Sequence, residues 1–363
     1  MASWGAMTNG GKTGAFRSPG REGSAQARLA HRLAGELRHS ADIALFSDSL
    51  HSRWTDALLA ETRFHLAGTM NAVEMAMRLE VSEGDIEARL AGLAQPWCAP
   101  ALERQSDLLT AELLAHYRLR GALSVVQRDK TQAGADGTDA LLAPGEGSPF
   151  AQALAALSLA EQRWSGPMLF DAPLRPDLPA EIFCELVWTV AALLIHGLSL
   201  NATESDRDAA PALVQAAERI IARHDEGSGP FALARRCARA LSTSERRRIA
   251  PLALSGRRLL LFCALVEGET ALPAEAVLGA LVDGGGEARR AILKLMEIDE
   301  ALAVQLFEML APMTGGIAGH DAALLAFIER YRETSQIEAE TWLSDMLVPS
   351  ALAAKLAIVG SAA

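Results

Sequence analysis

The chain has 363 residues, of which half are hydrophobic and only 5% aromatic, and its formal net charge at pH 7 is −11. The apolar residues are mostly alanine and leucine, which favour helices over strands. An acidic chain lacks the large basic surface of a general nucleic-acid binder or of a protein that lies on anionic membranes. Length and composition therefore predict one large or two ordinary all-α domains.

The N-terminal stretch Gly5–Gly14, "GAMTNGGKTG", resembles a phosphate-binding loop. Such a loop needs glycine six positions before its lysine, and that position here is Ala6. The loop must also follow a buried strand and open a helix, whereas turn-forming residues and charges surround this stretch. We therefore expect residues 1–23 to be a disordered arm without a nucleotide site.

Apolar residues spaced three, four or eight apart predict an N-terminal helical domain over residues 24–128. The second helix of this domain is expected to end near Val81, and Ser82 is expected to cap the helix that follows. The expected helices are Ser24–His39, Leu50–Val81, a helix from Ser82 that ends before Pro96, and Ala101–Val126.

Residues 129–148 are rich in Gly, Asp, Ala and Pro, which predicts a linker or a long loop before a C-terminal helical domain, 149–363. Ser148 and Pro149 are expected to begin its first helix. The apolar stretch Ile182–Ile195 is 14 residues long and contains a glutamate, which favours a buried core helix over a membrane span. Breaks between stacked helix pairs, as in an α-solenoid or an irregular bundle, are expected at Gly197, Gly227–Pro230, Gly256, Gly268, Gly284–Gly286 and Gly315–Gly319.

A cluster of arginines in the C-terminal domain is the main candidate binding site. Eight arginines occur there with one acid, Glu245, in a chain that is acidic overall. Guanidinium groups pair with carboxylates or phosphates, so the cluster could hold an acidic protein or a nucleic acid; alternatively, its members lie on different helix faces and pair with acids of the fold. The eight are Arg235, Arg236, Arg239, Arg246, Arg247, Arg248, Arg257 and Arg258.

The other residue patterns in the sequence do not predict a DNA-binding, metal or catalytic site. The stretch Ala76–Leu90 has the outline of a helix-turn-helix, but carboxylates begin its second helix and would repel DNA. Glu61 and His65 are four apart, which predicts a contact on one helix face, and no second pair completes a metal site. Four scattered cysteines indicate core residues in a reducing compartment, the cytoplasm. No cofactor, metal or catalytic residues are predicted.

Two stretches, Leu58–Val81 and Arg257–Ile298, resemble a bacterial family of all-helical proteins with HEAT-like repeats and no known function. The first contains Val73, Glu74 and Arg78, similar to a Val-Glu and nearby Arg in the family; the second is similar to its pattern of an apolar helix ending in Glu-Gly, a helix, a glycine pair and another apolar helix. The resemblance implies an all-helical fold and no particular activity.

We hypothesise a helical scaffold that binds a protein partner, through the arginine cluster between Arg235 and Arg258. The same arginines leave open a nucleic-acid or nucleotide binder, whose affinity would fall steeply with salt. An enzyme with a site assembled only in space is the third hypothesis.

Overall fold

The computed structural model describes residues 54–132, 147–166, 174, 178–200, 202, 208–283, 285–313, 319–349, 352, 355, 356 and 359. Residues 36–347 form one compact unit, which contains almost all of them. The second unit comprises residues 1–35 and 348–363, and Leu352, Lys355, Leu356 and Val359 are helical within it. The expected arm, 1–23, and the expected helix Ser24–His39 lie outside the described residues.

Every regular element in the described part of the chain is a helix, which confirms the all-α prediction. The elements of the first half are α2 (Asp56–Glu80), α3 (Gly84–Gly92), α4 (Cys98–Glu103), α5 (Ala111–Gln132), α7 (Pro149–Ser165), α8 (Ala180–Leu200) and α9 (Ala210–Ala222). Those of the second half are α10 (Pro230–Arg239), α11 (Thr243–Ser255), α12 (Leu259–Thr270), α13 (Ala274–Asp283), α14 (Gly285–Leu295), α15 (Glu300–Leu310), α16 (His320–Glu333) and α17 (Gln336–Met346). Short 3-10 helices occur at Ser106–Leu108, Glu226–Ser228 and Ala311–Met313.

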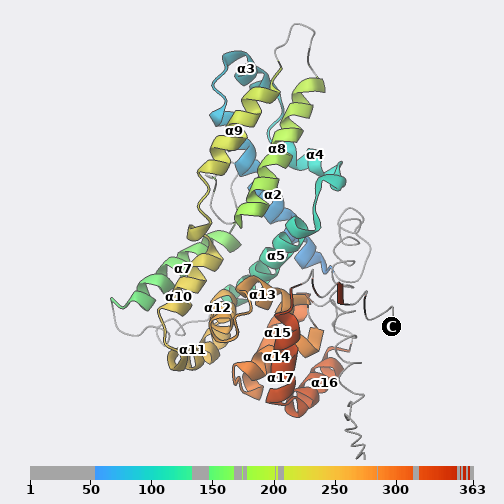
Figure 1. Cartoon of the computed structure of the whole chain (residues 1–363). Helices are drawn as coiled ribbons and strands as arrows, with labels where there is room; N and C mark the ends of the chain where they lie inside the picture. Colours follow the sequence, from blue (N-terminus) through green and yellow to red (C-terminus); the bar gives the residue numbers. More distant parts are fainter. Residues whose placement is uncertain are drawn as a thin grey trace, which may run out of the picture. The chain divides into compact units, whose positions relative to one another are not determined.

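The helices pack as pairs, many of them neighbours in the chain (Figure 1). α8 packs against α9, and α12 packs against both α11 and α13, while the longer-range pairs are α2 with α5 and α7 with α10. One hydrophobic cluster joins α2, α3, α4, α8 and α9, and a larger one joins α7 with α10 through α17; α5 contributes residues to both. α12 lies inside the larger cluster, because every residue from Leu259 to Val266 is buried. Burial of apolar surface of this kind is the main term that stabilises a helical fold.

Helix ends with a local chemical signal lie close to where the sequence predicts them. Ser148 accepts a hydrogen bond from the N–H of Ala151 at 3.1 Å, and Pro149 is the first residue of α7. Gly229 separates a 3-10 turn from α10, which begins at Pro230, and α2 ends before Val81. These positions follow the preferences of caps and of proline in the first turn.

The prediction of one continuous helix over Ala101–Val126 was wrong. This stretch is divided among α4, a 3-10 turn and α5, and the hydroxyl of Thr110 accepts from the N–H of Leu113 at 3.3 Å. A capping hydroxyl begins a new helix more readily than it continues an old one. α3 also differs, because its cap position is Glu83 and makes no side-chain cap hydrogen bond.

Two of the expected breaks are helical. Gly197 lies inside α8 and Gly268 inside α12. Both glycines admit a neighbouring side chain: a Cβ on Gly197 would lie 2.5 Å from Nε1 of Trp97, and one on Gly268 would lie 3.0 Å from Cδ of Arg246. Glycine occurs where the backbone must turn, and also where another part of the chain approaches closely. The second use leaves no local signal in the sequence.

α5 continues to Gln132, so the first residues of the expected linker 129–148 are helical. α5 and α7, on either side of it, pack against each other within the unit 36–347. The division into two domains at this segment stays a prediction.

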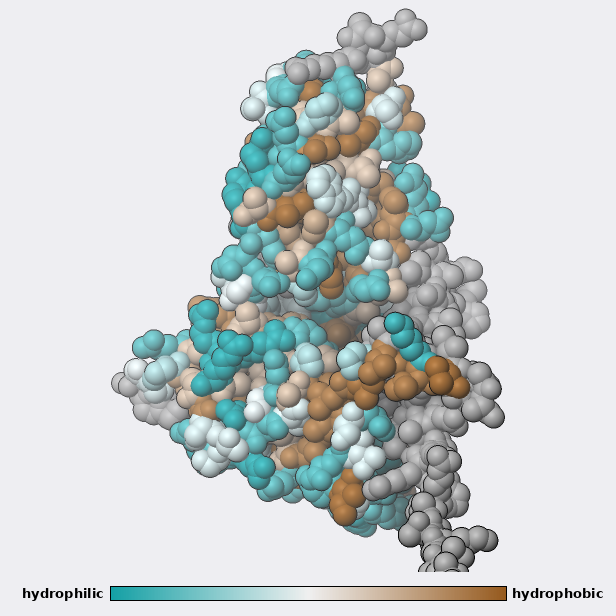
Figure 2. Space-filling model, viewed as in Figure 1, coloured by the Kyte–Doolittle hydropathy of each residue, from teal (hydrophilic) through white to brown (hydrophobic). Residues whose placement is uncertain are grey.

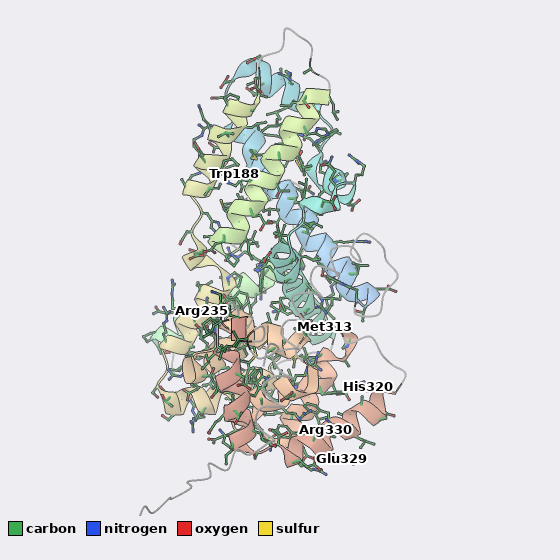
Figure 3. The ribbon with its side chains drawn as sticks, turned by 45° about the vertical axis from the view of Figure 1, so that its right-hand side comes forward. Trp188, Arg235, Met313, His320, Glu329 and Arg330 are labelled. Carbon is green, nitrogen blue, oxygen red and sulfur yellow. The ribbon has the colours of Figure 1, made fainter. Side chains whose placement is uncertain are left out.

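α8 is 21 residues long, so the expected length of 14 residues was too short. By length and composition it is the one described helix that could cross a membrane. Half of its most apolar stretch is buried inside the structure, as in the core helix of a soluble protein. Trp188 at its surface is 39% exposed (Figure 3).

On the face drawn in Figure 2, hydrophobic residues are scattered among polar ones in the upper part and gather in a band in the lower part. Scattered exposed apolar side chains are normal and do not by themselves indicate a binding surface. The most exposed within the unit 36–347 are Leu79, Leu159, Leu200, Leu325 and Ile337.

Candidate binding cleft on helix α10

Several arginines of the predicted cluster are bound to carboxylates of other helices. Arg246 on α11 donates its Nε to Glu269 at 2.7 Å. Arg247, next to it, pairs with Glu269 at 3.5 Å and with Glu297 at 3.0 Å. Guanidinium groups that are already paired in this way have less charge to offer a phosphate or an acidic ligand.

Arg258 is the most deeply buried member, with only 3% of its surface exposed. Its Nε lies 2.9 Å from a carboxylate oxygen of Glu161 on α7, and its Nη2 donates to the hydroxyl of Ser158 at 2.8 Å. Arg257 beside it is half-buried and has a left-handed backbone with φ of 55°. These two arginines lie at the turn before α12, where Arg258 ties this turn to α7.

Arg235 on α10 lies between two carboxylates. Its Nε donates to Oε2 of Glu267 on α12 at 2.8 Å, and its Nη2 donates to Oε2 of Glu275 on α13. Burial disfavours the guanidinium charge, but the hydrogen bonds and charges of Glu275 and Glu267 outweigh it, so the pKa of Arg235 is raised. Arg235 is therefore a fixed cation at the junction of three helices (Figure 3).

Arg236, Arg239 and Arg248 differ from the others. All three are exposed, and none forms an ion pair with a carboxylate in the described part of the chain. Arg236 and Arg239 lie on α10 with Arg235, while Arg248 lies on α11. At about 100° of rotation per residue, Arg235 and Arg239 share one face of α10 and Arg236 lies beside it.

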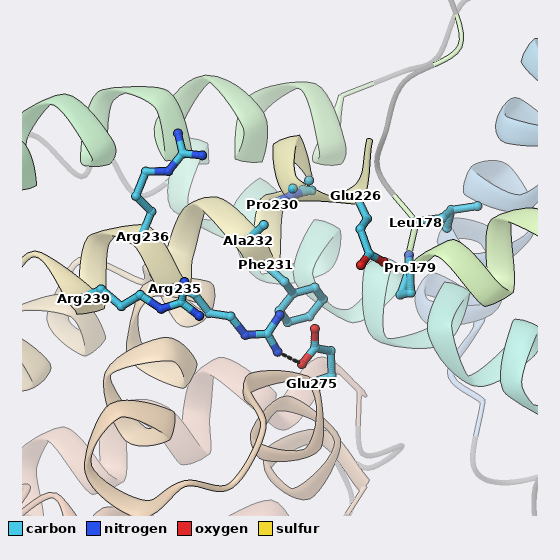
Figure 4. Close-up of a pocket in the computed structure, with 12 residues that line it drawn as sticks. Leu178, Pro179, Glu226, Pro230, Phe231, Ala232, Arg235, Arg236, Arg239 and Glu275 are labelled. Carbon is cyan, nitrogen blue, oxygen red and sulfur yellow. Dashed lines mark hydrogen bonds and ion pairs between the residues drawn. The ribbon is translucent and has the colours of Figure 1, made fainter. Parts of the chain in front are cut away.

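An open cleft of about 410 Å³ lies along this part of α10 (Figure 4). Its apolar wall includes Pro179 and Phe231, and its charged wall includes the three arginines of α10. Figure 4 shows Arg235 directed toward Glu275, and Arg239 on the same side of the helix. The lining comprises Leu178, Pro179, Glu226, Gly227, Gly229, Pro230, Phe231, Ala232, Arg235, Arg236, Arg239 and Glu275.

Both acids of the cleft make contacts within the fold. Glu226 accepts a hydrogen bond from the N–H of Ala180 at 2.9 Å, at the first turn of α8. A carboxylate there also faces the positive end of the helix dipole. Glu275 accepts from Arg235. The lining therefore carries three arginines against two glutamates, and Arg236 and Arg239 are its two cations without a described carboxylate partner.

The expected contact between Glu61 and His65 is confirmed, in a buried seam between α2 and α5. Nε2 of His65 lies 3.6 Å from Glu61 and 2.6 Å from the hydroxyl of Ser124. Burial, with a smaller effect of the charge of Arg120, lowers the pKa of His65 to about 3, so the ring is neutral at pH 7. Among the described residues, no three His, Cys, Asp or Glu side chains are grouped as metal ligands.

Three of the four thiols are not activated as nucleophiles. Burial raises the pKa of Cys237 to about 12, and it also raises the pKa of Cys98 and of Cys263. Cys184 is half-buried, and all four cysteines are unbridged. A thiolate is the reactive form of cysteine, so these three buried thiols are suited to packing.

Sequence reasoning located the basic wall of the cleft but not the remainder. Glu226 and Glu275 join the arginines only through the packing of α10 against the 3-10 turn before it and against α13. The local signal available was the Gly229-Pro230 start of α10, which places Phe231 and Arg235 on the first two turns of one helix.

No family model matches the chain, and neither the curated proteins nor the solved structures include a significant match. The resemblance to a HEAT-like family stays a prediction.

Proposed function

We propose that this protein is a helical scaffold that binds a partner protein, and that the cleft on α10 receives an acidic segment of that partner. The observation that carries the proposal is the pair Arg236 and Arg239, exposed at an open cleft without a carboxylate partner, while Glu226 and Glu275 are engaged within the fold. An arginine fork binds a carboxylate with charge-assisted hydrogen bonds.

The apolar wall of the cleft supports a protein segment as the ligand. Pro179, Pro230 and Phe231 offer hydrophobic contacts next to the cations, which suits a segment that carries both carboxylates and apolar side chains. The net charge of −11 does not oppose this at close range, because physiological salt screens exposed charges beyond about 8 Å.

Nucleic-acid binding by the whole arginine cluster has less support. A nucleic acid is bound by many cations along one surface. Here Arg235, Arg246, Arg247 and Arg258 are each paired with a carboxylate. An enzyme with a spatially assembled site stays a hypothesis without a supporting observation. Four unbridged cysteines support our further proposal that the protein works in the cytoplasm.

The binding test uses a short fluorescein-labelled peptide rich in Glu and Leu, and the same peptide with Gln in place of each Glu. We expect the acidic peptide to bind the full chain at physiological salt and the Gln peptide to bind more weakly. The double variant Arg236→Glu/Arg239→Glu should weaken binding of the acidic peptide at least about tenfold, since each lost charge-assisted contact is worth about 1.5 to 3 kcal/mol.

The matched control is Arg248→Glu, an exposed arginine outside the cleft lining. It should change the affinity less than about twofold. Equal losses in the control and in the double variant, or no binding by the wild type, would contradict the proposal. Tight, steeply salt-dependent binding of a single-stranded RNA, with none of the peptide, would favour the nucleic-acid alternative.

A further inference from the structure

Glu275 lines the cleft and holds its carboxylate against one of the arginines of α10. Its Oε2 accepts from Nη2 of Arg235, on the face of α10 that also carries Arg239 (Figure 4). We infer that Arg235 and Arg239 together form the carboxylate clamp of this cleft, and that Glu275 is an internal competitor which the incoming carboxylate displaces. This inference rests on the proposed function.

The two carboxylates bound to Arg235 differ in how firmly they are held. Glu267 accepts from Nε of Arg235 and also from the N–H of Ala274, at 3.0 Å, in the first turn of α13. The described contacts of Glu275 include only Arg235, and its side chain is the more exposed of the two, 34% against 27%. Glu275 can therefore swing away without uncapping a helix, while Glu267 keeps Arg235 in place.

The spacing of the two arginines favours an additional anion. Arg235 and Arg239 are four residues apart on α10, and like charges at this spacing repel each other. Glu275 lines the cleft and contacts Arg235, whereas Arg239 has no described ion-pair partner. A carboxylate placed between them would contact both guanidinium groups, whereas Glu275 contacts only that of Arg235.

The guanidinium groups of Arg235 and Arg239 also indicate the chemical class of the ligand. A single carboxylate bound by two guanidinium groups suits a glutamate or aspartate side chain, or a chain-terminal carboxylate, beside an apolar residue that contacts Phe231. A neutral ligand such as the Gln peptide is not expected to replace Glu275, because an amide oxygen offers Arg235 no charge. The competition between Glu275 and the ligand for Arg235 therefore selects acidic ligands.

The decisive variant is Glu275→Gln, titrated with the same acidic peptide. Removing the internal carboxylate should raise the affinity about tenfold, and the gain should disappear when Arg235→Gln is added. The control is Glu218→Gln on α9, an exposed residue outside the cleft that changes the net charge of the chain by the same amount. It should change the affinity less than about twofold.

A second measurement follows NMR signals of Arg235 in the wild-type chain. A variant is needed only to assign these signals. The Nη–H signals of Arg235, which report on its hydrogen bond to Glu275 and are assigned by their loss in Arg235→Lys, should shift when the acidic peptide is added and stay unchanged with the Gln peptide. An unchanged signal under saturating acidic peptide would overturn the inference.

The outcomes separate this inference from the proposed function. If Glu275→Gln and Glu218→Gln behave alike while the Arg236→Glu/Arg239→Glu variant still loses binding, the internal competition is overturned and the binding cleft stands. If neither the wild type nor Glu275→Gln binds the peptide, both are overturned.

Discussion

Arg78 donates two hydrogen bonds to one carboxylate oxygen of Glu74, from Nε at 3.0 Å and from Nη2 at 2.7 Å, and both side chains are buried on α2. The other oxygen of Glu74 accepts from the N–H of Cys98 at 2.7 Å, at the start of α4. Arg78 also donates to the carbonyls of Leu90 and Ala94, at the end of α3 and just after it. One ion pair thus satisfies backbone groups at the ends of two helices, which would otherwise be buried without partners.

Glu74→Ala should therefore be strongly destabilising. It leaves the Arg78 guanidinium buried without its counterion and removes the acceptor from the first N–H groups of α4. We expect the free energy of unfolding to fall by about 3 to 5 kcal/mol, as when one partner of a buried ion pair is removed. Urea unfolding followed by circular dichroism measures it.

The matched control for this prediction is Glu218→Ala, an exposed glutamate in α9, which should stay within about 0.5 kcal/mol of the wild type. A loss below about 1 kcal/mol in Glu74→Ala would show that the pair does not hold the three helices together.

Gly197→Ala tests the packing of Trp97 on α8. The added Cβ would lie 2.5 Å from Nε1 of the indole, which now donates to the carbonyl of Leu193 at 3.1 Å. We expect a loss of about 1 to 3 kcal/mol in the free energy of unfolding, because an overpacked site must shift a side chain or the backbone. Urea unfolding at pH 7.5 gives the value.

Gly279→Ala in α13 is the comparison, since nothing lies within 4 Å of the added Cβ there. Alanine is favoured over glycine inside a helix, so this variant should gain about 0.5 to 1 kcal/mol. Equal stabilisation of both variants would refute the close approach of Trp97.

Two buried histidines predict a loss of stability in acid. The pKa values of His65 and His116 are each lowered to about 3, first by burial and then by the charge of Arg120. The unfolded chain binds these protons near pH 6.5, so the stabilisation is complete above that pH and is lost as pH falls toward 3. Well below pH 6.5, we expect a slope of about 1.4 kcal/mol per pH unit for each histidine.

The measurement is the free energy of unfolding in urea at pH 7.5, 6 and 5. His116→Phe should reduce the slope below pH 6.5, since the buried Nε2 of His116 has no described hydrogen-bond partner to lose. His196→Gln, exposed on α8, should leave the slope unchanged. The expectation fails if His116→Phe has the same slope as the wild type.

The sequence by itself determined the helical class and many of the helix ends. Apolar residues at helical spacing, the Ser148-Pro149 start and the Gly229-Pro230 break all act within one turn of chain, so their effect can be derived without knowing the fold. The contact between Glu61 and His65 belongs to the same class, because residues four apart share a helix face.

Tertiary structure alone decided which glycines break helices and which arginines remain unpaired. Gly197 is kept small by Trp97, which is 100 positions earlier in the sequence. Arg258 is neutralised by Glu161, while Arg239, of the same type and in the same segment, has no described ion-pair partner. Coulombic and steric contacts depend on distance in space, and the packing of α7, α10, α12 and α13 sets those distances over separations that local sequence patterns do not record.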